Sequence, residues 1–269
     1  MIHVAVCGTG RASMELIRAI KENEDFEAVA AFCRPGSLKA GKDIGALAGV
    51  GDTDVEYVEL TDAGVIFAHT KIDVAIDFST PETSKCLLNA CFKHGIPCVI
   101  CTTGFTDEEI EFLIRQTRAK KAGVVYAPNV TIGVNVLISL LKAVAKTLPQ
   151  FDYQITEIHH SRKLDRPSGT AKRIADTLED ALKQDGSVPI NSVRAGGYVG
   201  IHEVTAAGDY ERLTLTHESF SRRAFADGAL VAAKYVINRI GWYYMEDVLN
   251  IDLILTKSQA SNLKSRMEK

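Results

Sequence analysis

Short hydrophobic runs alternate with helical patterns through the first half of the chain. The runs typical of buried strands are residues 3–8, 27–33, 55–60, 73–79, 97–104 and 123–129. The stretches between them predict a Gly- and Lys-rich loop at 34–52 and helices at 13–23, 81–94 and 107–120. Strands that alternate with helices are typical of a parallel sheet wound with crossover helices, so this half predicts an α/β domain.

The hydrophobic pattern changes after Asn129. A long apolar helix is predicted at 134–147, then a strand at 151–160 and a helix that opens near Ser168. Three strand-like runs and one more helix follow, at 192–200, 202–208, 211–219 and 222–239. Consecutive strands indicate a second, α+β domain with a more open sheet, and they place a domain boundary near 127–130.

Composition and charge exclude several classes of protein. The formal net charge is −3 and 24% of the residues are charged, which does not favour a general nucleic-acid-binding or acidic-membrane surface. The first residues lack the basic segment and cleavage site of a secretory signal, and no apolar run reaches the length of a membrane span. We therefore expect a cytoplasmic protein without nucleic-acid or membrane partners.

All six cysteines lie in the first 101 residues, which is not the pattern of a small secreted disulfide framework. Cys98 and Cys101 match C-x-x-C, but they lie in a strand-like run, where residues three apart point to opposite faces. We expect the cysteines to be small buried hydrophobic residues.

A glycine turn follows the first predicted strand and precedes the first predicted helix. Gly8 and Gly10 would let the backbone approach a pyrophosphate, whose charge the helix N-terminus favours. A plain tight turn is the alternative, because G-x-G alone is a weak signal and Ser13 stands where Gly or Ala is usual. The candidate nucleotide-binding residues of this turn are Gly8, Thr9, Gly10, Arg11, Ala12 and Ser13.

The second predicted strand ends without the acid that usually holds the ribose of NAD. Cys33 stands in that place and Arg34 follows it, so Arg34 could bind the 2′-phosphate of NADP. A solvated basic loop is the alternative, since Lys39 and Lys42 come next. The sequence favours NADPH over NADH.

Small polar residues follow three further predicted strands. Loops at the carboxyl ends of parallel strands line the ligand crevice of such a sheet, although each loop alone could be a turn or a helix cap. The candidate cofactor-binding residues of these loops are Ser79, Thr80, Cys101, Thr102, Thr103, Ala127, Pro128, Asn129 and Val130.

The stretch 157–173 combines a histidine pair, a lysine and a Ser-Gly-Thr triplet. His159 could transfer a proton near neutral pH, and Lys163 supplies a compact cation. Ser168, Gly169 and Thr170 would supply hydroxyl and N–H groups for a carboxylate at a helix start.

Simpler interpretations of this stretch stay open. Ser168 could be only an N-cap, and His160 could be a structural histidine. A metal site from Glu157, His159, His202 and His217 is not favoured, because their spacing is not that of a metal motif.

Residues 157–171 resemble the signature of the 4-hydroxy-tetrahydrodipicolinate reductase (dihydrodipicolinate reductase) family. That signature is E-x-H-H-x-x-K-x-D-x-P-S-G-T-A, and every fixed position is present. Further segments similar to the family occur in family order at 77–82, 102–105, 132–137, 192–204 and 211–230.

The resemblance implies a Rossmann-type dinucleotide domain at 1–127, completed by 239–269. It also implies a substrate-binding and tetramerisation domain at 128–238, with an open mixed sheet through which a homotetramer forms.

The resemblance also implies an activity in lysine and diaminopimelate biosynthesis. NADPH or NADH would deliver hydride from nicotinamide C4 to 4-hydroxy-tetrahydrodipicolinate, giving 2,3,4,5-tetrahydrodipicolinate. His159 would donate the proton and Lys163 would stabilise the developing charge or share in the proton transfer. The residues implied to bind the carboxylates of the substrate are His160, Ser168, Gly169 and Thr170.

Departures from the family pattern lie in the cofactor half. The glycine turn is shorter than G-x-x-G-R-M-G, Cys33 replaces an acid, and Cys101 stands where Gly is usual. Pro128 also removes one backbone donor. Two other hypotheses are a related two-domain amino-acid dehydrogenase and a nucleotide-binding regulatory protein without turnover.

Overall fold

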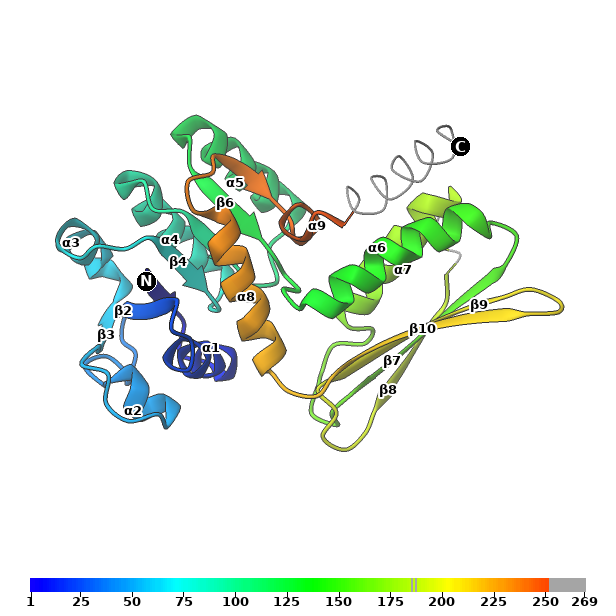
Figure 1. Cartoon of the computed structure of the whole chain (residues 1–269), viewed down its shortest axis with the longest axis horizontal. Coiled ribbons are helices and arrows are strands. Elements are labelled where there is room, and N and C mark those ends of the chain that lie inside the picture. Colours follow the sequence, from blue (N-terminus) through cyan, green and yellow to red (C-terminus); the bar gives the residue numbers. More distant parts are fainter. Residues whose placement is uncertain (185, 187, 252–269) are drawn as a thin grey trace, which may run out of the picture. The chain divides into compact units, whose positions relative to one another are not determined.

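The computed structural model describes residues 1–184, 186 and 188–251 (Figure 1). The described chain divides into two compact units. The first unit consists of Met1–Thr131 and Phe225–Leu249, and the second unit contains Ile132–Ala224.

The first unit is built on a seven-stranded sheet with the order β11-β6-β5-β4-β1-β2-β3, in which every pairing is parallel. Its strands are β1 (Ile2–Cys7), β2 (Phe26–Cys33), β3 (Tyr57–Glu59), β4 (Val74–Asp77), β5 (Cys98–Ile100), β6 (Gly123–Tyr126) and β11 (Gly241–Tyr243). Its helices are α1 (Arg11–Lys21), α2 (Ile44–Ala48), 3-10 helix η1 (Leu60–Asp62), α3 (Ala63–His69), α4 (Pro81–His94), α5 (Asp107–Lys120), α8 (Arg223–Val236) and α9 (Met245–Leu249). The predicted parallel α/β sheet is confirmed.

Both faces of this sheet are buried. On β1, Val4 and Val6 belong to one hydrophobic cluster and Ala5 and Cys7 to the other, because successive side chains of a strand point to opposite faces. From β1 the chain adds β2 and β3 on one side and then adds β4 on the other side of β1. The strand order therefore reverses between β1 and β4. A reversal of this kind is where open α/β sheets bind ligands.

The second unit is a four-stranded mixed sheet with the order β10-β9-β7-β8. Its elements are α6 (Ile132–Thr147), β7 (Asp152–His159), α7 (Gly169–Leu182), β8 (Ile190–Arg194), β9 (Gly200–Ala207) and β10 (Arg212–Ser219). β7 pairs with β8 in parallel and with β9 antiparallel. Buried and half-buried residues alternate along β9, so one face of the sheet carries the core and the other is open. The predicted open mixed sheet is confirmed.

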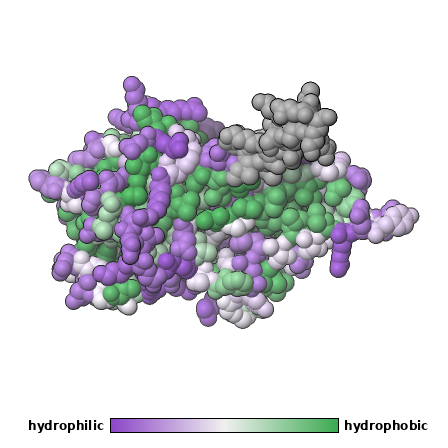
Figure 2. All heavy atoms as spheres, in the orientation of Figure 1, coloured by the Kyte–Doolittle hydropathy of each residue, from purple (hydrophilic) through white to green (hydrophobic). Residues whose placement is uncertain are grey.

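Helix α6 is apolar around much of its circumference. Hydrophobic residues follow α6 in Figure 2, and the side chains of Ile132 and Leu140 are 38% and 37% exposed. Its core-facing residues, among them Leu137, Ile138 and Leu141, pack with α7 and the sheet.

The unit boundaries differ from the division drawn on the sequence, which ended the second domain at residue 238. Helix α8 instead belongs to the first unit, because its buried alanines, including Ala226, Ala229 and Ala233, share a core with Val4 of β1. Residues 239–249 also lie in the first unit, where β11 pairs with β6. Asn250, which was expected in the first domain, falls in the second unit, and 252–269 lies outside the described residues.

Three local expectations were wrong. The stretch 34–52 contains the short helix α2, which the Gly- and Lys-rich composition concealed. The strand predicted at 192–200 ends at Arg194, because a turn separates β8 from β9. Cys86 is exposed on α4, although the other five cysteines are buried and all six are free thiols.

Each helix among the described residues falls short of the length and hydrophobicity that a membrane span requires.

Candidate active site

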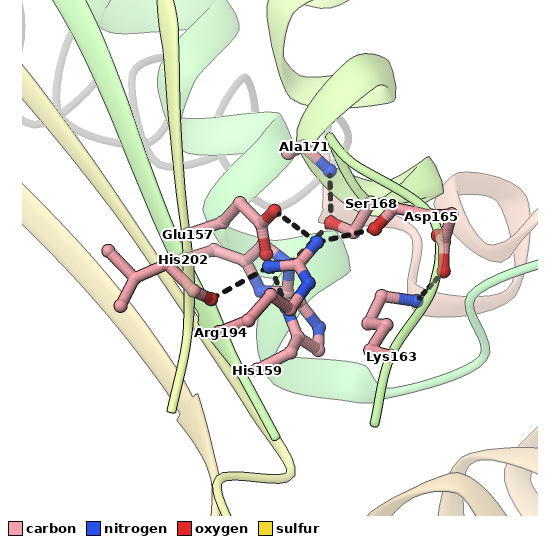
Figure 3. Close-up of polar contacts among 9 residues, drawn as sticks. Glu157, His159, Lys163, Asp165, Ser168, Ala171, Arg194 and His202 are labelled. Carbon is pink, nitrogen blue, oxygen red and sulfur yellow. Dashed lines mark hydrogen bonds and ion pairs between the residues drawn. The ribbon is translucent and has the colours of Figure 1, made fainter. Parts of the chain in front are cut away.

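Strand β7 places Glu157 and His159 on the same buried face of the second sheet. Buried residues alternate along β7, and residues two apart on a strand point the same way. The Glu157 carboxylate accepts a hydrogen bond at Oε2 from His159 Nδ1, and Glu157 is fully buried (Figure 3). The first histidine of the signature is therefore held by a carboxylate from its own strand.

The neighbouring strand β8 supplies the partners of Glu157. The parallel register sets Ser192 opposite Glu157 and Arg194 opposite His159. Arg194 Nη2 donates to Glu157 Oε1 at 2.7 Å, and the Arg194 side chain is only 1% exposed. Burial opposes the charge of Glu157, but the hydrogen bonds from Arg194, Ser192 and His159 outweigh it and lower the pKa of Glu157 to about 2.

On the other side of β7, β9 and β10 bring two more histidines to this face. The register sets His202 opposite Glu157, and His217 opposite His202. The ring centroids of His159 and His202 lie 5.2 Å apart. Burial, reinforced by His159 and His217, lowers the pKa of His202 to about 3, so His202 is neutral. In the described part of the chain, no cluster of three or more side chains has the arrangement of a metal site.

Burial also lowers the pKa of His159 below its ordinary value of 6.5, although Glu157 opposes this effect. His159 is 8% exposed. Its ring is therefore held neutral in the free protein, with Nδ1 directed to the Glu157 carboxylate.

Lys163 and Asp165 lie in the segment between β7 and α7. Lys163 Nζ contacts Asp165 Oδ1 at 2.8 Å, and the Lys163 side chain is 23% exposed. The Asp165 carbonyl oxygen accepts a hydrogen bond from Arg194 Nη2 at 2.5 Å. Arg194 thus contacts both the carboxylate that holds His159 and the backbone of the segment that carries Lys163 (Figure 3).

Ser168 is the N-cap of α7. Its hydroxyl oxygen accepts a hydrogen bond from the Ala171 N–H at 3.2 Å and lies 3.4 Å from His202 Nε2. Gly169 begins the helix on an exposed surface, and a Cβ atom there would meet nothing within 4 Å. Ser168 therefore caps α7, and the start of the helix at Gly169 is still open to a ligand. Thr170, the next residue, is half-buried.

His160 follows the last residue of β7 and takes a different environment from His159. It is half-buried, and its backbone N–H donates to the Tyr198 carbonyl at 2.9 Å. The sequence singled out both histidines, but only His159 shares the buried face with Glu157.

The predicted nucleotide-binding residues lie at the carboxyl ends of the strands in the first unit. At the end of β1, Gly8 has a φ of +111°, and a Cβ atom there would lie 2.2 Å from the Phe78 carbonyl oxygen. Gly8 therefore lets the ends of β1 and β4 pack together. Tyr57, which donates from its hydroxyl to the Gly8 carbonyl at 2.9 Å, also holds this turn.

Gly10 is the N-cap of α1 and has a different reason to be glycine. No side chain caps the helix at this position, and a Cβ atom on Gly10 would meet nothing within 4 Å. Ser13, by contrast, is fully buried beneath the turn, and its hydroxyl contacts the Phe78 carbonyl at 3.4 Å. Thr9 and Ala12 are half-buried, and Arg11 is exposed.

Asp77, which the sequence did not single out, connects the predicted loops. This fully buried carboxylate accepts hydrogen bonds from the hydroxyls of Ser79 at 2.5 Å, Thr102 at 2.7 Å, and Ser84. Thr102 also accepts from the Ser79 N–H at 2.8 Å. In the sequence, the only sign of this role was that Asp77 is an acidic residue at the end of a hydrophobic strand.

The loop after β2 places Lys39 at the glycine turn, where Lys39 Nζ donates to the Thr9 carbonyl at 2.6 Å. Arg34 is exposed at the start of this loop, as a residue that binds a ligand phosphate must be. The sequence indicates Lys39 only as part of a basic loop, because its proximity to Thr9 depends on how the loop folds.

The remaining predicted cofactor residues are unevenly accessible. Thr80 and Thr103 are exposed, whereas Ala127 and Val130 are almost fully buried, and Pro128 and Asn129 lie between these extremes. Cys101 is 7% exposed, and burial raises the pKa of its thiol well above 9.0, so this thiol is not a ready nucleophile.

Comparisons with known proteins place both units in one family. The family models described as dihydrodipicolinate reductase, N-terminus and C-terminus match residues 2–130 and 133–249. The 4-hydroxy-tetrahydrodipicolinate reductase of Methanopyrus kandleri is 40% identical over 268 residues, covering 93% of this chain and 97% of the relative. That of Geotalea daltonii is 38% identical over 272 residues, covering 93% and 100%. The chain belongs to the dihydrodipicolinate reductase family.

Solved structures agree with this assignment. The dipicolinate-bound dihydrodipicolinate reductase from Paenisporosarcina sp. TG-14 superposes with a TM-score of 0.75 and 26% identity, covering 91% of this chain and 97% of that one. An amine dehydrogenase from Mycobacterium smegmatis shares the fold alone, with a TM-score of 0.66 and 15% identity, covering 90% of this chain and 94% of that one. The resemblance stated from the signature is confirmed.

Dihydrodipicolinate reductases are NAD(P)H-dependent oxidoreductases of lysine and diaminopimelate biosynthesis. The residues of this chain fit such a cofactor. The uncapped N-terminus of α1, with open space above Gly10, leaves N–H groups available to a pyrophosphate, and Lys39 adds a cation beside the turn. The shortened glycine turn is therefore compatible with dinucleotide binding.

Proposed function

We propose that this chain catalyses the NAD(P)H-dependent reduction of 4-hydroxy-tetrahydrodipicolinate to 2,3,4,5-tetrahydrodipicolinate. The observation that carries the proposal is the buried Glu157–His159 pair beside Lys163 and the open start of α7. The dipicolinate in the Paenisporosarcina reductase supports a small dicarboxylate as substrate.

A bound reduced nicotinamide would supply hydride from its C4 atom. His159 is the proton donor to the anion that develops on the substrate, and Lys163 stabilises that charge or shares in the proton transfer. The substrate carboxylates bind to His160 and to the Ser168-Gly169-Thr170 segment, where the first N–H groups of α7 lie at an exposed surface.

The cofactor binds at the carboxyl ends of the strands of the first unit. Gly10 and the first turn of α1 hold the pyrophosphate, while Ser79, Thr80, Thr102 and Thr103 line the nicotinamide side. NADPH is the preferred cofactor, because Cys33 leaves the end of β2 without an acid and Arg34 is exposed beside it.

Turnover tests the main proposal. Oxidation of NADPH and of NADH, followed by absorbance, is measured with freshly generated 4-hydroxy-tetrahydrodipicolinate. The substitution His159→Gln should lower kcat roughly 100-fold or more while the Kd of the nucleotide stays near that of the wild type. Nucleotide binding without any turnover in the wild type would instead support a regulatory protein.

Cofactor choice is tested separately at Arg34. The substitution Arg34→Ala should weaken NADPH binding roughly ten-fold or more and leave NADH binding nearly unchanged, because only NADPH carries the 2′-phosphate. Titration calorimetry with both nucleotides measures this difference. Equal losses would remove Arg34 from the recognition of the phosphate.

We further propose that the chain forms a homotetramer through the open face of the second sheet. Half-buried residues alternate along β9 on the face without a helix layer, which supports this face as an interface. Light scattering coupled to size-exclusion chromatography measures the oligomer, and a monomer at micromolar concentration would refute the proposal.

A further inference from the structure

A continuous series of polar contacts lies behind the proposed proton donor. His159 Nδ1 meets Glu157 Oε2, and Glu157 Oε1 meets Arg194 Nη2 at 2.7 Å. Glu157 and Arg194 have side chains that are 0% and 1% exposed. A buried ion pair of this kind costs desolvation energy, so folding stability alone is a weak reason for its presence.

The guanidinium of Arg194 also spans two segments. Besides Glu157, it contacts the Asp165 carbonyl through Nη2 at 2.5 Å and the Val193 carbonyl through Nη1 at 2.8 Å. Asp165 in turn contacts Lys163 Nζ through its carboxylate at 2.8 Å. One buried side chain therefore constrains both the end of β7 and the segment of the proposed catalytic lysine.

The contact with Glu157 determines which nitrogen of His159 can serve the substrate. Glu157 is ionised and can only accept a hydrogen bond, so Nδ1 carries a proton in both states of the ring. No hydrogen bond among the described side chains uses Nε2. On that side a Cβ atom at Gly200 would lie 3.0 Å from Nε2, so glycine leaves room beside this atom.

We propose that Glu157 and Arg194 are positioning residues for the proton transfer. Glu157 holds His159 with Nε2 directed to the substrate, and Arg194 holds Glu157 and the Lys163 segment in one arrangement. This inference rests on the proposed function. In the step, the Nε2–H bond of the imidazolium breaks and the proton bonds to the anion formed on hydride addition. The other proton stays on Nδ1 of the now neutral ring, which donates it in a hydrogen bond to Glu157.

The main experiment compares Glu157→Gln with the control Glu24→Gln. The first substitution keeps the shape of the side chain but removes its charge, and the control makes the same chemical change at Glu24, an exposed residue of the first unit. We expect Glu157→Gln to lower kcat roughly 10- to 100-fold with little change in KM or in the Kd of NADPH, and Glu157→Asp to restore part of the loss. The control should match the wild type.

The pH profile separates positioning from a structural effect. The charged groups that face His159 are Glu157 on its own strand, Arg194 on β8 and Lys163 in the following segment, with His202 on β9 beside them. Removal of the Glu157 charge takes away the only group of these that favours the imidazolium. The descending limb of kcat/KM should therefore move to lower pH in Glu157→Gln, and it should stay in place in Glu24→Gln.

Two further measurements keep the inference testable. Nitrogen-15 NMR of the wild-type imidazole should show neutral His159 protonated at Nδ1, and protonation at Nε2 would overturn the inference even if the variants fail to fold. The substitution Arg194→Lys should lower kcat, and its effect should be less than multiplicative with Glu157→Gln, because the two residues act as a unit. A kcat and a pH profile in Glu157→Gln equal to those of the wild type would also refute the positioning role.

Failure of this inference differs from failure of the proposed function. If the wild type does not turn over 4-hydroxy-tetrahydrodipicolinate, the proposed function fails, and the NMR spectrum still decides the tautomer. If the wild type turns over and Glu157→Gln is unchanged, only the positioning role fails.

Discussion

At the scale of single residues, the environment of each group decides its chemistry more than its type does. His159, His202 and His217 are all histidines, yet only His159 has a carboxylate partner, and burial lowers the pKa of all three. Burial raises the pKa of Cys101, which makes a reactive thiol beside the cofactor loops unexpected. The lowered pKa of His159, the proposed proton donor, favours its neutral form in the free protein.

The pH dependence of turnover follows from this state of His159. A proton donor must be protonated, so kcat/KM should fall as the pH rises through the lowered pKa of His159 in the free enzyme. A bound dicarboxylate adds negative charge near the ring and favours the imidazolium, so kcat should fall at a higher pH than kcat/KM. Steady-state pH profiles measure both limbs, and coincident limbs would contradict the assignment.

At the scale of elements, strand ends and helix starts carry the candidate sites. Parallel strands bring the ends of β1, β4 and β5 to one edge of the first sheet, where Asp77 joins the segments after β4 and β5 through hydroxyl groups. The two glycines of the turn after β1 serve different purposes. Gly8 permits close packing of the protein backbone, whereas Gly10 leaves space that a ligand can use.

Substitution of the two glycines by alanine should separate these purposes. Gly8→Ala places a methyl group 2.2 Å from the Phe78 carbonyl oxygen at a φ of +111°, so we expect a loss of about 3 kcal/mol or more in the free energy of unfolding. Gly10→Ala should cost less than about 1 kcal/mol but raise the Kd of NADPH roughly ten-fold. Urea unfolding and calorimetry test the pair, and equal stability losses would contradict it.

Asp77 should act on several loops together. Burial raises the pKa of Asp77, whose carboxyl oxygens accept from three hydroxyls. In Asp77→Asn, the hydroxyls of Ser79, Ser84 and Thr102 lose one of these acceptor oxygens, so the free energy of unfolding should fall by about 1–3 kcal/mol. The exposed Asp107 of α5 provides the control Asp107→Asn. A Kd for NADPH that rises only in Asp77→Asn would show that the network shapes the cofactor loops, and unchanged values in both variants would refute that role.

At the scale of the whole molecule, the chain divides its chemistry between two units. The predicted nucleotide-binding residues belong to the first unit, and the proposed catalytic and substrate-binding residues belong to the second. The second unit carries a row of histidines across three neighbouring strands, and their burial couples its stability to pH.

Stability should fall on acidification because His202 must gain a proton. Its pKa of about 3 in the folded protein lies below its ordinary value of 6.5, so its contribution is present above pH 6.5 and is lost as the pH falls toward 3. The slope is up to about 1.4 kcal/mol per pH unit for this single group. The substitution His202→Gln should flatten the pH dependence of urea unfolding followed by circular dichroism. The exposed His69→Gln serves as the control and should not change the slope.

The sequence by itself determined the fold class and the chemical content of the site. The alternation of strands and helices was sufficient to predict the parallel sheet, because each element shows a local periodicity of its own. The signature was sufficient to predict the proposed catalytic and substrate-binding residues, because His159, Lys163 and Ser168 lie within a few positions of one another. Short elements such as α2 escaped because few residues carry their pattern.

Only the tertiary structure decided which distant residues meet. Arg194 reaches Glu157 because β8 pairs with β7, and Lys39 reaches Thr9 because the loop after β2 folds back to the glycine turn. Helix α8 joined the first unit for the same reason, since periodicity shows which face of a helix is apolar but not which core will bury it. Strand pairing and helix packing are long-range choices, and a local pattern does not contain them.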